Sequence, residues 1–299
     1  LVVDLTVRSD WAQKPAEPRT IKLGAVCLPP NPQRDLAAGR EAVCNAIAAC
    51  AKLGADLVCL PENCFAGGAL DAQATSVPVA TGDGLAVVAG LCLANRLWAV
   101  LPIYRQNSHT GRHESVALLF DRQGRLAGQY VKTHLNEFER TRFDLAPGDA
   151  LPVFQADFGK FGLLLGEDFL QPEAGRALFL QGAEVLCWAG SPMPFFPSAR
   201  MLKLLTSSRA IDNFAHVAAS NFETEPPWRP GLCLRTGCVV EARGTVAADT
   251  AYRPGVAVAP VTLPASRPFY GSFGAPAAFD LRLSTLRQRR PHLFAACAT

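Results

Sequence analysis

The chain has 299 residues, 49% of them hydrophobic, which is enough for a sizeable buried core and excludes a disordered chain. Its formal net charge is only +3 and its basic residues are scattered, so we expect no nucleic-acid partner. The sequence contains no run of about 18 apolar residues, and we therefore expect no membrane span.

Ten cysteines lie at irregular positions, several of them inside apolar runs such as residues 57–60 and 185–188. They show no zinc-ligand spacing, and disulfide frameworks belong to small secreted domains. Residues 1–20 contain no basic segment followed by a long apolar run, so we expect no secretory signal. These features predict buried free thiols in a cytoplasmic protein that holds no metal and no other cofactor.

The first third of the chain alternates apolar strands with helices. Residues 21–28 form an apolar run ended by two prolines, and residues 35–53 carry apolar side chains at helical spacing before a glycine. A second apolar run, residues 56–62, ends on a proline and a carboxylate. A helix at 84–97 and a strand at 98–104 follow, which completes two strand–helix–strand units.

A hairpin and a long loop come next. Residues 115–120 and 126–130 are apolar and flank a turn at 121–124, a pattern typical of a β-hairpin. Residues 132–149 are polar, charged and irregular. A loop of that length inside a compact domain usually carries function.

The remaining elements repeat the alternation of strands and helices. They are strands at 151–155 and 160–165, a helix at 174–181, a strand at 185–188, a helix at 199–213 with Ser198 as its N-cap, and short strands at 216–220, 237–241 and 245–248. We expect regular structure to end there, and the density of Pro and Gly from Pro264 onward predicts an extended tail. This order predicts one α/β domain of mixed sheets covered by helices.

Residues 161–173 predict a strand that stops at Gly166, a polar elbow, and a helix that begins near Pro172. A strand–elbow–helix junction presents side chains and free backbone N–H groups at one edge of a sheet, where catalytic nucleophiles are often placed. The elbow position of this chain holds a glycine, which carries no chemical group of its own.

Two charged residues also follow apolar strands. Glu62 is expected at the rim of a sheet, where partial burial raises a carboxyl pKa and suits a general base, or it is an ordinary turn carboxylate. Lys132 is either a surface lysine or, if it faces Glu62, a donor that stabilises an oxyanion. Taken singly, these residues leave both alternatives open.

Their joint order carries more information. The matching segments are Leu60-Pro61-Glu62, residues 130–135 with Glu139, residues 162–168 with Pro172 and Glu173, residues 182–185, 209–213 and 219–221, Gly237 with Gly244, and residues 289–294. Together they resemble the nitrilase superfamily of carbon–nitrogen hydrolases over about residues 21 to 294. Three spaced motifs in order are more specific than any one of them.

The resemblance implies a four-layer αββα sandwich for residues 21–263, with residues 1–20 as an N-terminal arm and 264–299 as a tail that forms an interface arm. It implies a homodimer or higher homo-oligomer that acts on a small-molecule substrate, either an amide, a nitrile or an N-carbamoyl compound. By the same resemblance Glu62 is the general base, Lys132 the oxyanion partner, and Glu139 the second acid that holds Lys132 and the substrate.

The family's nucleophilic cysteine corresponds to Gly166. Milder departures are Cys27, Gly68 and Cys238, where glutamine, an aromatic residue and serine are usual. Because the thiolate is the nucleophile, a chain without it forms no covalent acyl-enzyme.

Cys64 and Cys187 are the nearest cysteines in sequence, and both are expected to be packed rather than reactive. Three explanations of Gly166 therefore stay open. The cysteine of a hydrolase was replaced on purpose, or a natural relative uses Glu62 and Lys132 for non-covalent hydration or elimination, or the chain is a non-catalytic binding or partner subunit. The retained base and lysine favour the first two.

The substrate pocket is marked only by position. Candidate pocket residues follow strands at the same sheet edge, and they are Glu167, Trp188, Ser191 and Met193. Each of them is either a pocket residue or an ordinary packing residue. Residues 195–199 and 223–228 are expected to shape the entrance.

Overall fold

The computed structural model describes residues 17–29, 31, 35–66, 83–141, 143–190, 199–223 and 236–265, together with 268–269, 279–280, 282, 285–286 and 288–293. A 12-stranded sheet runs through the described part in the order β5-β4-β3-β2-β1-β9-β8-β7-β6, with β10, β11 and β12 attached beside this path. It divides into two half-sheets.

The first half-sheet contains β1 (Arg19–Leu28), β2 (Leu57–Cys59), β3 (Trp98–Gln106), β4 (His113–Phe120), β5 (Leu126–Val131) and β12 (Gly255–Leu263). The second contains β6 (Val153–Ala156), β7 (Gly159–Leu165), β8 (Val185–Ala189), β9 (His216–Phe222), β10 (Cys238–Val240) and β11 (Val246–Asp249).

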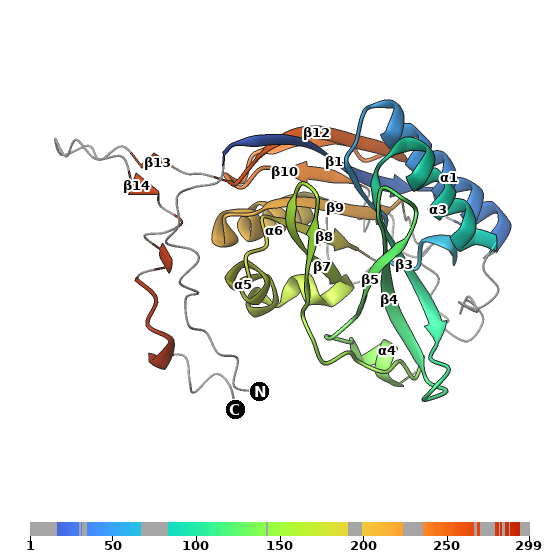
Figure 1. Cartoon of the computed structure of the whole chain (residues 1–299). Coiled ribbons are helices and arrows are strands. Elements are labelled where there is room, and N and C mark those ends of the chain that lie inside the picture. Colours follow the sequence, from blue (N-terminus) through green and yellow to red (C-terminus); the bar gives the residue numbers. More distant parts are fainter. Residues whose placement is uncertain are drawn as a thin grey trace.

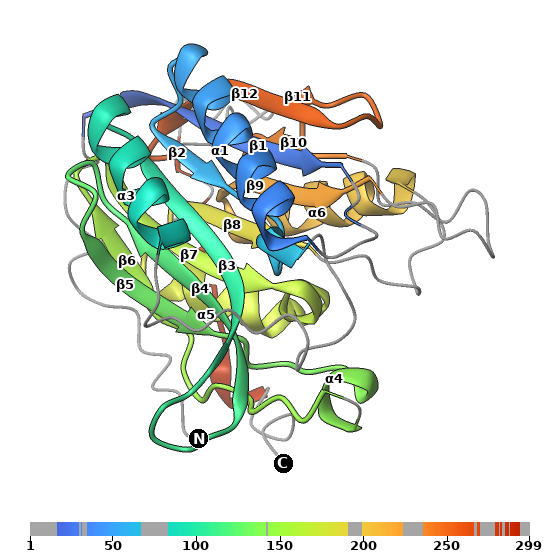
Figure 2. The same cartoon turned by 90° about the vertical axis from the view of Figure 1, so that its right-hand side faces the viewer.

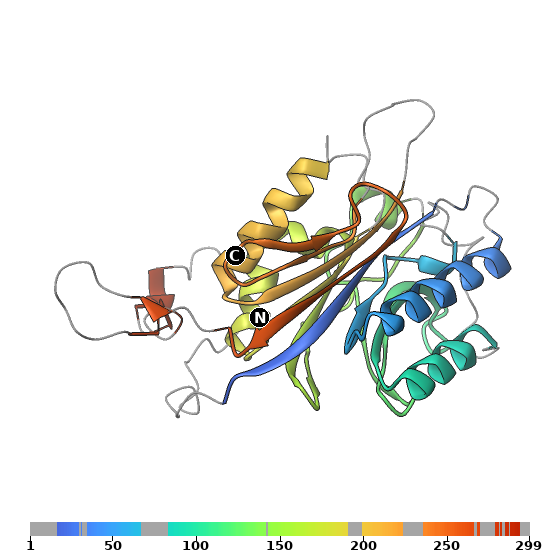
Figure 3. The ribbon, with the colours of Figure 1, turned by 90° about the horizontal axis from the view of Figure 1, so that it is seen from above.

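Three apolar clusters define four layers. One lies between the half-sheets, a second between the first half-sheet and helices α1 (Leu36–Lys52) and α3 (Asp83–Asn95), and a third between the second half-sheet and helices α5 (Pro172–Leu180) and α6 (Ala199–Asn213). Figures 1 and 3 show the two helix pairs on opposite outer sides, and Figure 2 shows α1 and α3 side by side over the first half-sheet. This αββα sandwich confirms the predicted fold class.

Strand β7 shows why the strands of this sheet are continuous apolar runs. Phe161, Leu163 and Leu165 face the core between the half-sheets, whereas Leu164 faces the helices. Successive side chains of a strand point to opposite faces, so a strand buried on both sides needs apolar residues at every position. The second face of β7 is covered by α5, whose first helical residue is the proline predicted there.

Strand β1 joins the two half-sheets. Residues 23–25 pair with β2, and residues 27–28 pair with β9. At this junction the hydroxyl of Ser220 accepts a hydrogen bond from the backbone N–H of Val26 at 2.9 Å and donates one to the carbonyl of Cys59 at 2.8 Å. One buried hydroxyl thereby completes backbone hydrogen bonds of β1 and β2 where the half-sheets separate.

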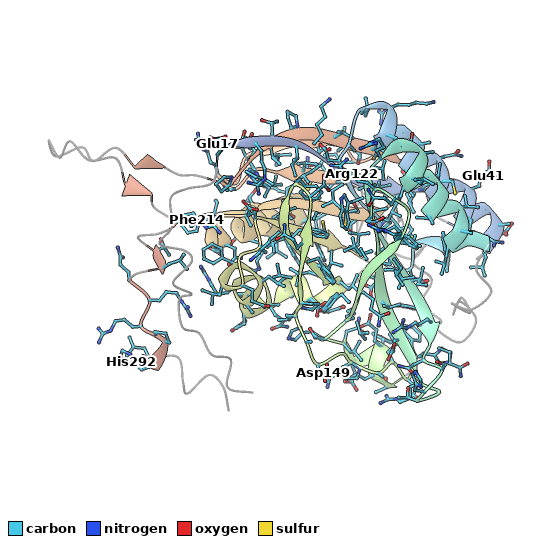
Figure 4. All side chains as sticks on the ribbon, in the orientation of Figure 1. Glu17, Glu41, Arg122, Asp149, Phe214 and His292 are labelled. Carbon is cyan, nitrogen blue, oxygen red and sulfur yellow. The ribbon has the colours of Figure 1, made fainter. Side chains whose placement is uncertain are left out.

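Arg122 lies in the turn of the β4–β5 hairpin (Figure 4) and connects the half-sheets there. Lys132 follows the other end of β5. The guanidinium of Arg122 donates to Asp56, just before β2, at 2.8 Å and to Asp157, in the turn between β6 and β7, at 2.9 Å. The indole of Trp98 donates to the same Asp157 at 2.6 Å. These charge-assisted bonds connect the two layers at the end of the sandwich opposite the strand ends that carry the charged residues.

The nine-residue strand β12 overturns the expectation that regular structure ends at residue 248. It pairs antiparallel with β1 from Arg19 to Cys27. Pro260, opposite Lys22 and exposed, lies within its apolar run, and a proline inside such a run argues against a strand. Among the described strands β12 pairs with β1 alone, and an edge strand tolerates a proline because its outer side needs no N–H donor.

Several smaller expectations are refined. Helix α1 begins after Asp35, whose carboxylate accepts from Ala37 N at 2.8 Å, and Gly54 follows its end as predicted. Strand β2 stops at Cys59, three residues before Glu62 and earlier than predicted.

The structure also contains short elements that were not predicted. The predicted loop 132–149 contains the short helix α4 (Glu137–Thr141), and the short 3-10 helices η2 (Cys64–Ala66) and η4 (Gly166–Leu170) follow β2 and β7. In the tail, β13 (Pro268–Phe269) pairs with β14 (Phe279–Asp280).

Candidate active site

The predicted catalytic residues meet where strands of the two half-sheets end. Glu62 follows β2 and Lys132 follows β5 in the first half-sheet, whereas Gly166 follows β7 in the second. These strands run in the same direction within their half-sheets, so their carboxyl ends share an edge. The backbone N–H of Glu62 donates at 3.0 Å to the carbonyl of Gly190, at the end of β8, which ties the two edges together.

The ammonium of Lys132 lies at the centre of this site. It donates to Glu139 Oε1 at 2.6 Å and to Glu167 Oε2 at 2.7 Å, and it lies 3.2 Å from Glu62 Oε1 and 3.4 Å from Glu62 Oε2. Lys132 and Glu62 are fully buried, and Glu139 and Glu167 are 3% and 7% exposed. Glu167, predicted as a pocket residue, thus has its carboxylate on Lys132.

Gly166 lies next to the charged groups of Lys132 and Glu62. Its φ is +45°, in the left-handed region that glycine adopts without strain. A Cβ built on its α-carbon would lie within 3.0 Å of both Lys132 Nζ and Glu62 Oε2. Glu62 and Lys132 therefore both lie next to the position that the first side-chain atom of residue 166 would occupy.

The carboxylate of Glu139 is held by a capping box at the start of α4. Asn136 Oδ1 accepts from the backbone N–H of Glu139 at 2.9 Å, and Glu139 Oε2 accepts from the backbone N–H of Asn136 at 2.9 Å. The Asn136 side chain also donates to Glu167 Oε1 at 2.7 Å. Sequence reasoning missed Asn136, although the pattern of Asn followed three residues later by Glu is the signature of such a box.

Glu62 and the elbow have their own supports. The hydroxyl of Ser115, on β4, donates to Glu62 Oε1 at 2.6 Å. No sequence pattern singled out Ser115, because it lies within an apolar run and reaches Glu62 across 53 residues. Its contact leaves Glu62 Oε2, which faces Gly166, with only the 3.4 Å contact to Lys132 among the hydrogen bonds of the described residues.

Asp168 connects the elbow to the segment that carries Lys132. Its two oxygens accept from the hydroxyl of Tyr130 at 2.6 Å, the backbone N–H of Leu165 at 2.9 Å, the hydroxyl of Thr133 at 2.9 Å and the backbone N–H of His134 at 2.8 Å. Burial alone would raise the pKa of Asp168, but hydrogen bonds from His134, Tyr130 and Leu165 bring it below its ordinary value. An ionised Asp168 thus positions the residues on both sides of Lys132.

The cluster of three carboxylates and one ammonium shifts its own proton affinities. Burial and the neighbouring Glu167 raise the pKa of Glu62, against the opposing pull of Lys132. Burial, with Glu62 and Glu167 adding to it, raises the pKa of Glu139 to about 8. Burial opposes the charge on Lys132, but the three carboxylates hold its pKa well above the ordinary value. Lys132 is therefore a cation at neutral pH.

The structure removes Trp188 from the list of pocket residues on the described surface. Its indole is fully buried in the core under α5 and α6, stacks on Phe169 with ring centres 4.1 Å apart, and donates to the Gly166 carbonyl at 3.0 Å. Trp188 thus lies on the helix side of β8, and its hydrogen bond supports the elbow. Ser191 and Met193 lie outside the described residues, as do most of the predicted entrance segments.

The two cysteines considered as substitute nucleophiles are buried thiols. Cys64 Sγ donates to the Pro102 carbonyl at 3.2 Å, and burial raises the pKa of this thiol far above its ordinary value. A hydrogen bond with Cys59, together with burial, raises the pKa of Cys187. Both are protonated at neutral pH, and a thiol is a far weaker nucleophile than a thiolate.

Within the described ranges, no group of three or more His, Cys, Asp or Glu residues is arranged to hold a metal ion. In the same part of the chain, no helix has both the length and the apolar character needed to cross a membrane.

The fold is an αββα sandwich, and a glutamate–lysine–glutamate set lies at its strand ends. These two features assign the protein to the class of hydrolases. A family model described as carbon-nitrogen hydrolase matches residues 22–269. The chain belongs to this family, which confirms the resemblance found in the sequence.

Relatives and solved structures agree with this assignment. The chain is 27% identical to the deaminated glutathione amidase of Synechocystis over 256 residues, 78% of this chain and 87% of the relative. It is 35% identical to the N-carbamoylputrescine amidase of Arabidopsis thaliana over 111 residues, which cover 36% of this chain and only 34% of that relative.

Two crystal structures show the same fold. An amidase from Nesterenkonia sp. aligns with a TM-score of 0.72 at 20% identity, covering 93% of this chain and 96% of that one. Saccharomyces cerevisiae Nit3, a member of the nitrilase superfamily, aligns with a TM-score of 0.70 at 21% identity, covering 81% and 90%.

The pKa of Glu139 predicts a stability that falls in alkaline solution. The folded protein keeps the Glu139 proton up to about pH 8, whereas the unfolded chain releases it near the ordinary value of 4.5. This carboxyl therefore stabilises the fold least above pH 8. We expect the free energy of unfolding to drop between pH 6 and 9 by on the order of 2 kcal/mol more in the wild type than in Glu139→Gln.

Urea unfolding at several pH values measures this difference. Glu137→Gln, on the exposed side of the same short helix, is the matched control and should follow the wild type. A Glu139→Gln protein whose stability declines in parallel with the wild type would contradict the assignment.

Proposed function

We propose that this chain is a carbon–nitrogen hydrolase framework for a small amide, nitrile or N-carbamoyl compound, with Gly166 at the position of the nucleophile. Glu62 is the base, Lys132 the oxyanion partner and Glu139 the acid that holds Lys132. The observation that supports this most directly is that Glu62 Oε2 and Lys132 Nζ both lie within 3.0 Å of where a Cβ of residue 166 would be. Named amidases among the relatives support the substrate class.

The roles follow from the chemistry of a cysteine at this position. Glu62 would take the thiol proton while sulfur attacks the substrate carbon, and Lys132 would hold the oxygen of the tetrahedral intermediate. The amine would leave with the proton returned by Glu62, and water would then hydrolyse the thioester. A glycine supplies no sulfur, so the chain as it stands forms no thioester.

Gly166→Cys tests the proposal. We expect amide hydrolysis and an acyl-enzyme mass increment on residue 166, measured by mass spectrometry after rapid quenching on a panel of small amides and nitriles. The left-handed φ makes any side chain there cost about 1–2 kcal/mol in stability.

Gly166→Ala is the matched control, since it carries the same backbone strain without a thiol. It should lose similar stability and show neither turnover nor an adduct. A folded Gly166→Cys protein that stays silent on the whole panel would rule out Gly166 as the nucleophile position.

A second candidate function is non-covalent acid–base chemistry, either hydration or elimination. It is favoured by the raised pKa of the fully buried Glu62, which with Lys132 forms an acid–base pair facing an α-carbon that has no side chain. Such a site could take a proton from water or from a substrate carbon without forming a covalent intermediate.

This candidate predicts turnover by the chain as it stands. NMR of the substrate panel should show product formation that falls at least about 100-fold in Glu62→Gln and in Lys132→Ala. Glu41→Gln, on the exposed face of α1, should leave it unchanged (Figure 4). Activity that persists in both site variants would exclude this chemistry.

We further propose that the chain assembles as a homodimer or higher homo-oligomer in the cytoplasm, with residues 264–299 as an interface arm. Helix α6 supports the assembly, because Met201, Leu204 and Ile211 lie on one helical face and are 44%, 56% and 42% exposed. The free state of the described cysteines supports a reducing compartment.

Leu204→Glu tests the interface. A carboxylate in an apolar contact is desolvated without a partner, so this variant should sediment as a monomer where the wild type sediments as an oligomer. Leu93→Glu, at an equally exposed leucine on α3, should leave the oligomer intact. A wild-type chain that sediments as a monomer would contradict the proposal.

A further inference from the structure

The ammonium of Lys132 has three N–H bonds, and three carboxylates surround it. The two shortest contacts, at 2.6 and 2.7 Å, go to Glu139 and Glu167, and the longer ones, at 3.2 and 3.4 Å, go to Glu62. An oxyanion partner must direct one N–H at the substrate oxygen. In this arrangement every N–H of Lys132 already has a carboxylate acceptor.

The glutamates are not equivalent. Both oxygens of Glu139 are engaged, one by Lys132 and the other by the capping box of α4, which fixes this carboxylate to a helix. Glu62 is held by Ser115 and faces the position of the nucleophile. Glu167 is the additional acceptor, and it immediately follows the glycine in the elbow.

The position of the ammonium also depends on the missing side chain. A Cβ at residue 166 would come within 3.0 Å of Lys132 Nζ, so the glycine gives the ammonium room to lie close to the elbow. Glu167 then binds it there from the next residue of the chain. Gly166 and Glu167 together therefore keep the ammonium of Lys132 next to the elbow.

We propose that Glu167 is a positioning residue that competes with the substrate for Lys132, so that an amide or carbamoyl ligand binds by placing its carbonyl oxygen on the N–H that Glu167 now occupies. This inference rests on the proposed function of the Glu62–Lys132–Glu139 set. Asn136 makes the exchange feasible, since it holds Glu167 Oε1 independently and keeps one partner on the carboxylate after Lys132 leaves it.

Ligand affinity tests the competition without any chemistry. NMR titration of the Gly166 chain with propionamide should give a dissociation constant about tenfold lower in Glu167→Ala than in the wild type. Glu167→Gln should fall between the two, because a neutral amide oxygen is a weaker acceptor than a carboxylate. Glu173→Gln, an exposed glutamate in the first turn of α5, should bind like the wild type.

Glu167→Asp keeps the charge and withdraws it from Lys132 by one methylene, and it covers the case in which neutral substitutions do not fold. It should also bind propionamide more tightly than the wild type. Unchanged or weaker binding in the folded Glu167 variants would overturn the inference, because a purely structural carboxylate leaves the ligand's access to Lys132 unaltered.

Kinetics separate this inference from the proposed function. Gly166→Cys combined with Glu167→Gln should hydrolyse amides with a kcat/KM up to about tenfold above Gly166→Cys alone, through a lower KM. The acidic limb of its kcat/KM profile should move to lower pH, since Glu167 helps to raise the pKa of Glu62. A merely structural role would not move that limb.

A failure of the Glu167 inference and a failure of the proposed function give different results. If Gly166→Cys alone is as active as the double variant with the same pH profile, the role of Glu167 is overturned and the hydrolase framework stands. If both are inactive while Glu167→Ala binds propionamide tightly, the competition for Lys132 stands and the hydrolytic role falls.

Discussion

A fully buried lysine is the constraint on which the rest of the site depends. Removing an ammonium from water is costly unless hydrogen-bonded counter-charges surround it, and Lys132 has three carboxylates within 3.4 Å. Burial, to which the mutual repulsion of the carboxylates adds, raises the pKa of Glu62 and Glu139. The group is therefore stable only as a whole, and the capping box, Ser115 and Asn136 hold its members at fixed distances.

The cluster lies across the two half-sheets, so it is also a joint between them. Glu62 and Lys132 belong to the first half-sheet, whereas Gly166 and Glu167 belong to the second. Asp168 strengthens the joint by accepting hydrogen bonds from both sides, and its lowered pKa keeps it ionised. The Ser220 hydroxyl does the same for the backbone where β1 passes between the halves. The contacts that shape the site and those that join the layers overlap.

Much of this fold could be predicted because its strands are buried on both faces and read as apolar runs ended by Pro, Gly or a charge. Strand β12 was not predicted because its partner β1 is more than 200 residues away in the sequence and because Pro260 lies within its apolar run. Trp188 was assigned to the pocket from its place near a strand end, yet the side it faces was set by the alternation of β8 against α5 and α6. A sequence pattern predicts where a residue lies along a strand more readily than it predicts which residues the side chain contacts.

By itself, the sequence determined the α/β order of strands and helices and the order of Glu62, Lys132, Glu139 and the elbow glycine, because strand ends and turn residues are local properties of the chain. The resemblance carried by those motifs added the family and the αββα class. Only the tertiary structure decided that Glu167 binds Lys132, that Asn136 and Ser115 hold the carboxylates, and that the ammonium fills the space above Gly166. Those contacts join residues up to 53 positions apart. Their geometry follows from two half-sheets packing face to face, which no local pattern encodes.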